Sequence, residues 1–251
     1  MPRTGWGWEI TPEELRSWIL FEDDRLLVVN KPGLVVCHPS KHGPWSSLIG
    51  ACRELLGLDR LHMPSRLDRE TSGVVVFAKD ARTGSLLQRA IQHRKVRKIY
   101  HAVLVGALRE PACVRGAIGK DTGSVVWMKQ GLREDGQPAQ TEFFPLGCDA
   151  EYTLVRVQPH TGRLHQIRVH ASSICHPVAG DKIYGPDERL FLEFLETGWT
   201  ERLARLLRFE RQLLHASEWQ CLEESMPLHF CASLPEEWKA VTCVADAAIQ
   251  P

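Results

Sequence analysis

Residues 65–78 read SRLDRETSGVVVFA and join a polar segment directly to an apolar one. The polar part carries two carboxylates, two guanidiniums and several hydroxyls, whereas residues 74–78 are apolar and too few for a helix of their own. We therefore expect a loop that enters a buried strand. A neighbouring cation favours the ionised form of a carboxyl group, so Asp68, between Arg66 and Arg69, is predicted to be a base or nucleophile. A turn held by ion pairs is the structural alternative.

Along the rest of the chain, the sequence predicts strands and helices in irregular alternation. Thr11, Pro12 and Glu14 form a capping box that starts a short helix ending near Phe21, and Asp80 caps a second helix. Strands are expected over 26–29, 74–78, 99–106, 125–128, 140–144 and 152–157, and later helices from 187 to 198, through 203–207 and over 235–241. Strands without regular βαβ units favour an α+β fold with a mixed, largely antiparallel sheet and flanking helices.

Composition excludes several classes of protein. The chain has 251 residues, of which 43% are hydrophobic and 25% charged, as expected of a globular protein rather than a disordered one. The sequence has no apolar stretch long enough to span a membrane and no apolar leader segment, so we expect a cytoplasmic protein. The 8 cysteines contain no CxxC pair, and we expect them to be mostly buried thiols rather than disulfides or metal ligands.

Charge is segregated although 31 basic residues balance 31 acidic ones. Residues 81–109 hold seven Lys or Arg and no acidic residue, and residues 158–180 hold Arg163, Arg168 and four His, again with no acidic residue. This asymmetry is typical of a protein with one face turned to phosphates. A solvated helix face is the alternative for the first segment.

Four motifs in order now identify a resemblance. Residues 66–73 resemble the catalytic motif HRLDxxTSG of the RluA-type pseudouridine synthases, and residues 23–39 resemble the family's N-terminal segment with its NKPxGL and HP elements. Residues 98–106, KIYHAVLVG, are similar to its KxYxAxVxG segment. Residues 161–185 contain TGRLHQIRVH, HP, GD and YG and are similar to its last block.

The resemblance implies isomerisation of a uridine in tRNA or ribosomal RNA, on a pseudouridine synthase fold with a central catalytic cleft. The N1 glycosidic bond breaks, the uracil turns over, and C5 bonds to C1′. Neither a cofactor nor a metal is implied. RNA is the implied partner, and we expect a monomer.

Residue roles also follow from the resemblance. Asp68 is the essential carboxylate, which attacks the sugar or removes its 2′ proton. Tyr100 stacks on the target uracil near C5, and Arg168 pairs with Asp68. Arg66 fills the RNA stack that the flipped base leaves. The other implied substrate contacts are Leu67, Lys98, Arg163 and Gln166.

Alternatives remain open for several residues. Tyr100 could be a core aromatic, and Arg163 rather than Arg168 could pair with Asp68. His165 and His170 are expected to be hydrogen-bonded scaffold, and Gln166 a structural amide or an RNA contact. Lys31, Lys79 and Lys98 are candidate phosphate ligands.

The sequence also departs from the family's pattern. Ser65 stands where most relatives carry His. The first motif begins near Asp23, so we expect a helical extension over 1–22 and a stand-alone catalytic domain over 23–251 without an S4 domain. Two other functions compete: an idle RNA-binding or ribosome-assembly factor on the same fold, and a glycosidic hydrolase using Asp68 and Glu70.

Overall fold

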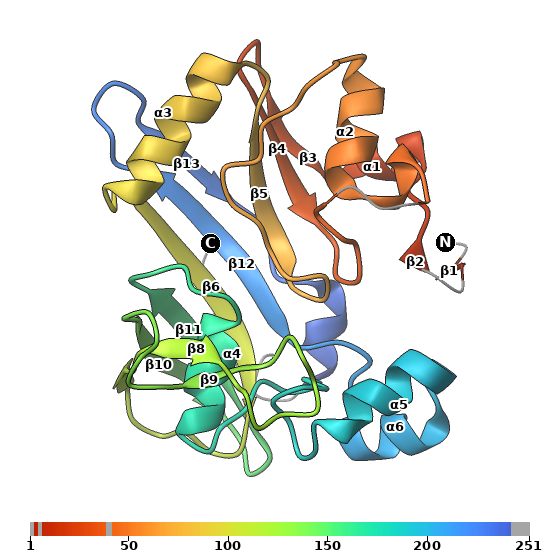
Figure 1. Ribbon diagram of the computed structural model, residues 1–251, viewed down its shortest axis with the longest axis vertical. Helices are drawn as coiled ribbons and strands as arrows, with labels where there is room; N and C mark the ends of the chain where they lie inside the picture. Colours follow the sequence, from red (N-terminus) through yellow and green to blue (C-terminus); the bar gives the residue numbers. More distant parts are fainter. Residues whose placement is uncertain (1–2, 5–6, 39–41, 242–251) are drawn as a thin grey trace. The chain divides into compact units, whose positions relative to one another are not determined.

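A computed structural model describes residues 3–4, 7–38 and 42–241 (Figure 1). The chain forms two compact units. The first unit comprises residues 1–98 and 216–233, and the second comprises residues 99–215 and 234–251. The predicted boundary between an extension over 1–22 and a domain over 23–251 stays a prediction.

The first unit alternates strands with three α-helices. Its elements are β1 (Arg3–Thr4), β2 (Gly7–Trp8), α1 (Pro12–Trp18), β3 (Ile19–Glu22), β4 (Leu26–Lys31), η1 (Pro44–Ser46), α2 (Leu48–Leu56), β5 (Ser72–Ala78), α3 (Ala81–Gln92), most of β12 (Leu214–Cys221) and β13 (Leu228–Cys231). The strand order is β3-β4-β5-β12, and β13 pairs with β12.

The predicted capping box of α1 is confirmed. The Glu14 N–H donates to the Thr11 hydroxyl at 3.2 Å, and the Thr11 N–H donates to the Glu14 carboxylate at 3.1 Å. The helix ends at Trp18 rather than near Phe21, because Ile19–Glu22 pairs antiparallel with β4 as strand β3. Tertiary pairing therefore overrides the local helical pattern.

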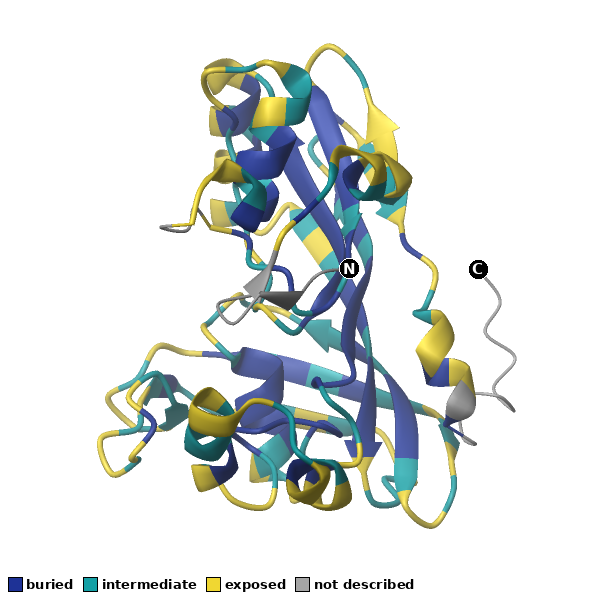
Figure 2. Ribbon diagram, turned by 90° about the vertical axis from the view of Figure 1, so that its right-hand side faces the viewer, coloured by how far each residue is buried: buried dark blue, intermediate teal, exposed yellow. Residues whose placement is uncertain are grey.

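Apart from Asn30, every residue of β4 and β5 is buried, so both faces of these strands are covered (Figure 2 colours the ribbon by burial). Leu27, Val29 and the α2 residues Leu48 and Ala51 belong to one apolar cluster. Leu26, Val28 and the α3 residue Leu87 belong to another. Alternate residues of a strand point to opposite faces, so the uninterrupted apolar runs at 26–29 and 74–78 reflect helices on both sides of these strands.

Gly73 fixes how the polar loop enters β5. Its φ is +114°, and a Cβ placed there would lie 2.2 Å from the carbonyl oxygen of Ala216 in β12. No other residue fits this conformation and this close approach. The glycine of residues 66–73 is therefore required by backbone packing.

The second unit is built on a four-stranded antiparallel sheet. Its order is β6-β11-β10-β7, formed by β6 (Val96–Val105, in this unit from Ile99), β11 (Tyr152–Pro159), β10 (Gln140–Cys148) and β7 (Ala112–Arg115). Strands β8 (Ile118–Lys120) and β9 (Gln130–Leu132) pair separately. The helices are α4 (Gln166–Ser173), α5 (Arg189–Thr197), α6 (Glu201–Leu207) and the 3-10 helix η2 (Glu236–Ala240).

The predicted α+β class with a largely antiparallel sheet and flanking helices is confirmed. The predicted strand over 125–128 is wrong, because side chains satisfy its backbone: the Val125 N–H donates to Glu188 at 3.1 Å and the Val126 N–H to the Ser124 hydroxyl at 3.0 Å. The expectation of mostly buried cysteines is also wrong. Among the seven described cysteines, all free thiols, Cys113, Cys148, Cys175 and Cys231 are exposed.

Cys243 and Pro39 lie outside the described residues. Within the described ranges, no helix has the length and apolar character needed to cross a membrane.

Candidate active site

A buried lysine anchors the polar loop that carries Asp68. The ammonium of Lys31, which is 0% exposed, donates to the carbonyls of Pro32, Val35 and Arg69 at 3.0, 2.8 and 3.1 Å. Three carbonyl acceptors satisfy the charge that burial takes from water. Lys31 is therefore a scaffold cation that ties the loop before β5 to the turn after β4, and its candidacy as a phosphate ligand is wrong.

The loop presents its predicted site residues at different depths. Arg66 is exposed, Asp68 is half-buried, and Leu67 packs against the apolar cluster beneath α1 and α2. The Thr71 N–H closes a turn on the Asp68 carbonyl at 3.2 Å. Partial burial lowers the pKa of His38, and the positive charge of Arg66 lowers it further, so Arg66 lies near the turn after β4. The loop thus displays a guanidinium beside a half-buried carboxylate.

In the second unit, Arg168 is locked by a carboxylate that sequence reasoning gave no role. Its Nε and Nη2 donate to Oδ2 and Oδ1 of Asp181 at 2.6 and 2.9 Å, and both side chains are buried. The N–H groups of Ile183 and Tyr184 also donate to Oδ1. Burial alone would raise the pKa of Asp181, but the Arg168 charge and these hydrogen bonds hold it below its usual range.

An aromatic ring and a histidine complete the surroundings of this ion pair. The Arg168 guanidinium lies 4.9 Å from the ring centre of Tyr184, a cation–π distance. The Tyr184 hydroxyl is 2.8 Å from Nδ1 of His165 and accepts from the Gln130 N–H at 2.8 Å. Arg168 is therefore held in one orientation from two sides.

Gln166 and His170 are bound within the scaffold around β10. The Gln166 oxygen accepts from Thr161 and from the Arg163 N–H, and its amide donates to the Gln140 carbonyl and the Thr141 hydroxyl at 2.9 and 3.0 Å. His170 contacts the Thr141 hydroxyl and the Gly116 carbonyl at 2.8 and 3.1 Å. The prediction that His165 and His170 are hydrogen-bonded is confirmed.

Arg163 lies at the edge of a surface pocket of about 290 Å³. Its Nε donates to the Pro138 carbonyl at 3.2 Å. Lys120, Gln130, Gln137 and Asp135 also line the pocket, so its wall carries hydrogen-bonding groups and charges of both signs.

Tyr100 and two lysines complete the predicted set. Tyr100 is 9% exposed on β6, opposite Val157 of β11. Burial of the Lys98 ammonium lowers its pKa to about 8, although the residue as a whole is half-buried. Lys79 forms an ion pair with Glu22 at 2.7 Å.

The predicted residues divide between the two units. Arg66, Leu67, Asp68 and Lys98 belong to the first, and Tyr100, Arg163, Gln166 and Arg168 to the second. The pairing of Arg168 with Asp68 stays a prediction. Asp181 belongs to the GD element of residues 161–185. That element was the signal in the sequence that could have identified it.

Comparison with known proteins agrees with these features. The RNA pseudouridylate synthase family matches residues 25–173. The chain is 32% identical to ribosomal large subunit pseudouridine synthase D of Xylella fastidiosa, over 91% of this chain and 69% of that protein. It is 34% identical to the protein of the same name in Vibrio vulnificus, over 89% and 69%.

Solved structures give the same result. Human RNA pseudouridylate synthase domain containing 4 is 28% identical, with a TM-score of 0.71 over 90% of this chain and 92% of that one. Human RNA pseudouridylate synthase domain containing 1 is 25% identical, with a TM-score of 0.69 over 86% and 82%.

The chain therefore belongs to the RNA pseudouridylate synthase family, in its RluA branch. It is an isomerase that converts uridine in RNA to pseudouridine.

Proposed function

We propose that the protein modifies ribosomal RNA and that Asp68 is its essential carboxylate. The name of the relatives from Xylella and Vibrio, ribosomal large subunit pseudouridine synthase D, supports the substrate. The placement of Asp68, half-buried in a loop that Lys31 anchors, supports the residue. A fixed, partly desolvated carboxylate is suited to act on a ribose without rearranging first.

The reaction needs no atom beyond those of the uridine. The N1–C1′ bond breaks, the C5–C1′ bond forms, C5 loses a proton and N1 gains one. Asp68 attacks the sugar or takes its 2′ proton to open the first bond, and it is released, or returns that proton, when C5 bonds to C1′. Tyr100 stacks on the uracil with its hydroxyl near C5, where the last proton is removed. No metal takes part in these steps.

Arg168 is proposed to orient and stabilise the ionised Asp68. Its bidentate bond to Asp181 supports this role, because a guanidinium held on one edge has little freedom left. Gln166, which already makes four hydrogen bonds, is expected to shape the loop of Thr161 and Arg163, and Arg163 to contact the RNA.

Binding of the RNA is proposed to use the basic segment of the first unit. The exposed arginines and lysines of this segment lie on α3, in the turn after it and at the start of β6: Arg82, Arg89, Arg94, Lys95 and Arg97. In a central cleft, Arg66 is proposed to enter the RNA stack in place of the extruded base. Extrusion of that base costs a few kcal/mol of unstacking. The enzyme is proposed to act as a cytoplasmic monomer.

The test is pseudouridine mapping across host ribosomal and transfer RNA. A strain lacking the gene is compared with strains carrying wild type, Asp68→Asn or the neighbouring control Glu70→Gln. We expect ribosomal sites that vanish, return with wild type and Glu70→Gln, and stay absent with Asp68→Asn.

Other outcomes contradict the proposal. Sites confined to tRNA would refute the ribosomal substrate. Sites restored by Asp68→Asn would remove Asp68 from the chemistry. No change at any site, together with no product on host RNA in vitro, would favour an idle RNA-binding factor.

A further inference from the structure

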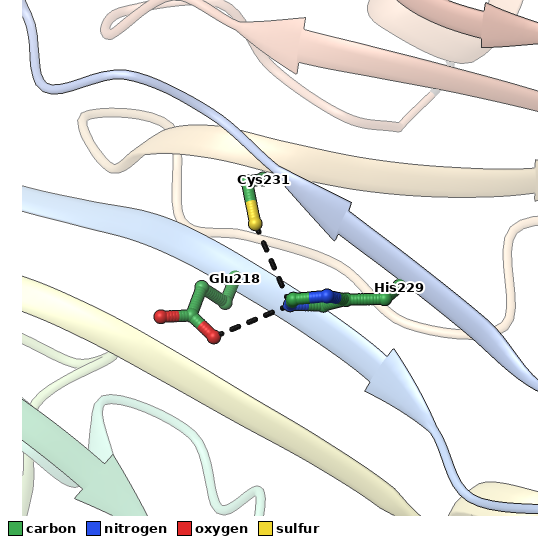
Figure 3. A group of neighbouring side chains, drawn as sticks. All are labelled: Glu218, His229 and Cys231. Carbon is green, nitrogen blue, oxygen red and sulfur yellow. Dashed lines mark hydrogen bonds and ion pairs between the residues drawn. The ribbon is translucent and has the colours of Figure 1, made fainter. Parts of the chain in front are cut away.

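The hairpin of β12 and β13 brings together a carboxylate, an imidazole and a thiol, side chains of the kinds that ligate metal ions (Figure 3). Glu218 lies on β12, and His229 and Cys231 lie on β13. The register pairs Glu218 with Cys231 and Gln220 with His229. Residues opposite each other on paired antiparallel strands point to the same face, and so do residues two apart on one strand. The three side chains therefore lie together on one face of the hairpin.

The alternation along the hairpin explains why the patch faces outward. Trp219 and Phe230, which pair between the two polar positions, point into the apolar core, and their rings lie 6.2 Å apart. Their burial fixes the register, because a slip by one residue would expose them. Glu218 and His229 are consequently 39% and 53% exposed, and Cys231 is exposed.

Two of the three spacings between ligand atoms match a tetrahedral metal site. His229 Nε2 lies 3.4 Å from both the Glu218 carboxylate and Cys231 Sγ, and the three donor atoms all lie within 4.8 Å of one another. Zinc bonds of about 2.0–2.3 Å at tetrahedral angles place neighbouring ligand atoms roughly 3.3–3.6 Å apart. The same nitrogen faces both partners, as one shared ion requires.

The hydrogen bonds of His229 Nε2 within this cluster compete with each other. A single ring nitrogen either carries a proton, and then donates to the carboxylate, or lacks one, and then accepts from the thiol. It does not serve both contacts fully. A cation bound to the sulfur, the nitrogen and the oxygen together contacts all three ligand atoms at once.

We propose that Glu218, His229 and Cys231 form a zinc site that ties β13 to β12. Thiolate and imidazole select zinc over calcium or magnesium, which prefer oxygen donors. Three protein ligands leave a fourth position for water or an external ligand on the exposed face. The proposal adds a metal to a chain whose sequence predicts none, and it is independent of the isomerisation.

The test uses the full, reduced, metal-stripped chain and Zn²⁺ alone, titrated in competition with a chromophoric chelator, with Co²⁺ as a spectroscopic substitute. We expect one equivalent of zinc and a thiolate-to-cobalt charge-transfer band. Cys231→Ser should abolish the band, and His229→Gln should weaken zinc binding at least about tenfold, since loss of even an outer-sphere partner weakens metal sites by 10–100-fold. Cys175→Ser, which removes an exposed thiol elsewhere, is the matched control.

Alkylation of the wild-type chain provides a readout that needs no variant to fold. Zinc should slow modification of Cys231 and leave Cys175 unaffected, as peptide mass spectrometry measures. Absence of a one-equivalent site, equal loss in Cys175→Ser, wild-type binding by Cys231→Ser, or alkylation of Cys231 unchanged by zinc would each overturn the proposal.

Discussion

Asp181 holds Arg168 through two hydrogen bonds, of 2.6 and 2.9 Å, between buried side chains. The carboxylate also accepts two backbone N–H groups at the turn that follows Gly180. The proposed partner of Asp68 is therefore itself positioned by a second carboxylate.

We expect Asp181→Asn to lower the free energy of unfolding by about 3–5 kcal/mol, because it leaves the Arg168 charge buried and unpaired. Urea denaturation measures this loss, and kcat should fall in the fraction that stays folded. The control is Asp135→Asn, which removes an equally bidentate but exposed pair with Arg133 and should leave stability unchanged. Equal effects of the two variants would contradict the buried-pair account.

Lys31→Met should destabilise the loop of Asp68 and the whole first unit. Three carbonyls lose a charged donor in a buried place, which costs roughly 3 kcal/mol or more. Thermal unfolding by circular dichroism measures the change, with the exposed Lys95→Met as control. A wild-type melting temperature for Lys31→Met would rule out the anchoring role.

RNA affinity should fall as the pH rises from 7 to 9. Burial lowers the pKa of Lys98 to about 8, so its ammonium is mostly charged at pH 7 and loses its charge as the pH passes through 8. Filter binding at fixed salt measures the affinity. Lys98→Arg, whose side chain stays charged, should flatten this pH dependence, while Lys95→Arg should not. An identical profile in wild type and Lys98→Arg would remove Lys98 from the interface.

Arg66→Ala should reduce kcat more than RNA affinity, because the guanidinium is proposed to fill the stack after base extrusion. The defect should shrink on a single-stranded substrate, where extrusion costs less. As an independent check of its position, the same variant should raise the pKa of His38 in an NMR titration, since the Arg66 charge now lowers it. A defect of equal size on paired and single-stranded RNA would argue against stacking.

RNA binding should weaken steeply with salt. Each phosphate that a basic side chain neutralises contributes about −0.7 to −0.9 to the slope of log affinity against log salt. Replacing Arg82, Arg89 and Arg94 together by Gln should reduce that slope by about 2–3 if each meets a phosphate. An unchanged slope would show that α3 and the turn after it present only a solvated face.

The family, the α+β class and five of the strands, namely β4, β5, β6, β10 and β11, follow from the sequence, because those depend on local patterns. The capping box at Thr11, the apolar runs at 26–29 and 74–78, and Asp80 as a helix cap each act within a few residues. The motif around Asp68 likewise lies in one continuous stretch.

Only the tertiary structure decided what the charged residues bind. Lys31 and Arg69 are 38 positions apart, and the Glu218 carboxylate meets His229 and Cys231 only across a strand pair. The strand predicted over 125–128 is wrong for the same reason, because the Val125 N–H donates to Glu188, which lies 63 positions away in the sequence. A buried or paired charge depends on which distant groups the fold brings to it, and no local pattern carries that information.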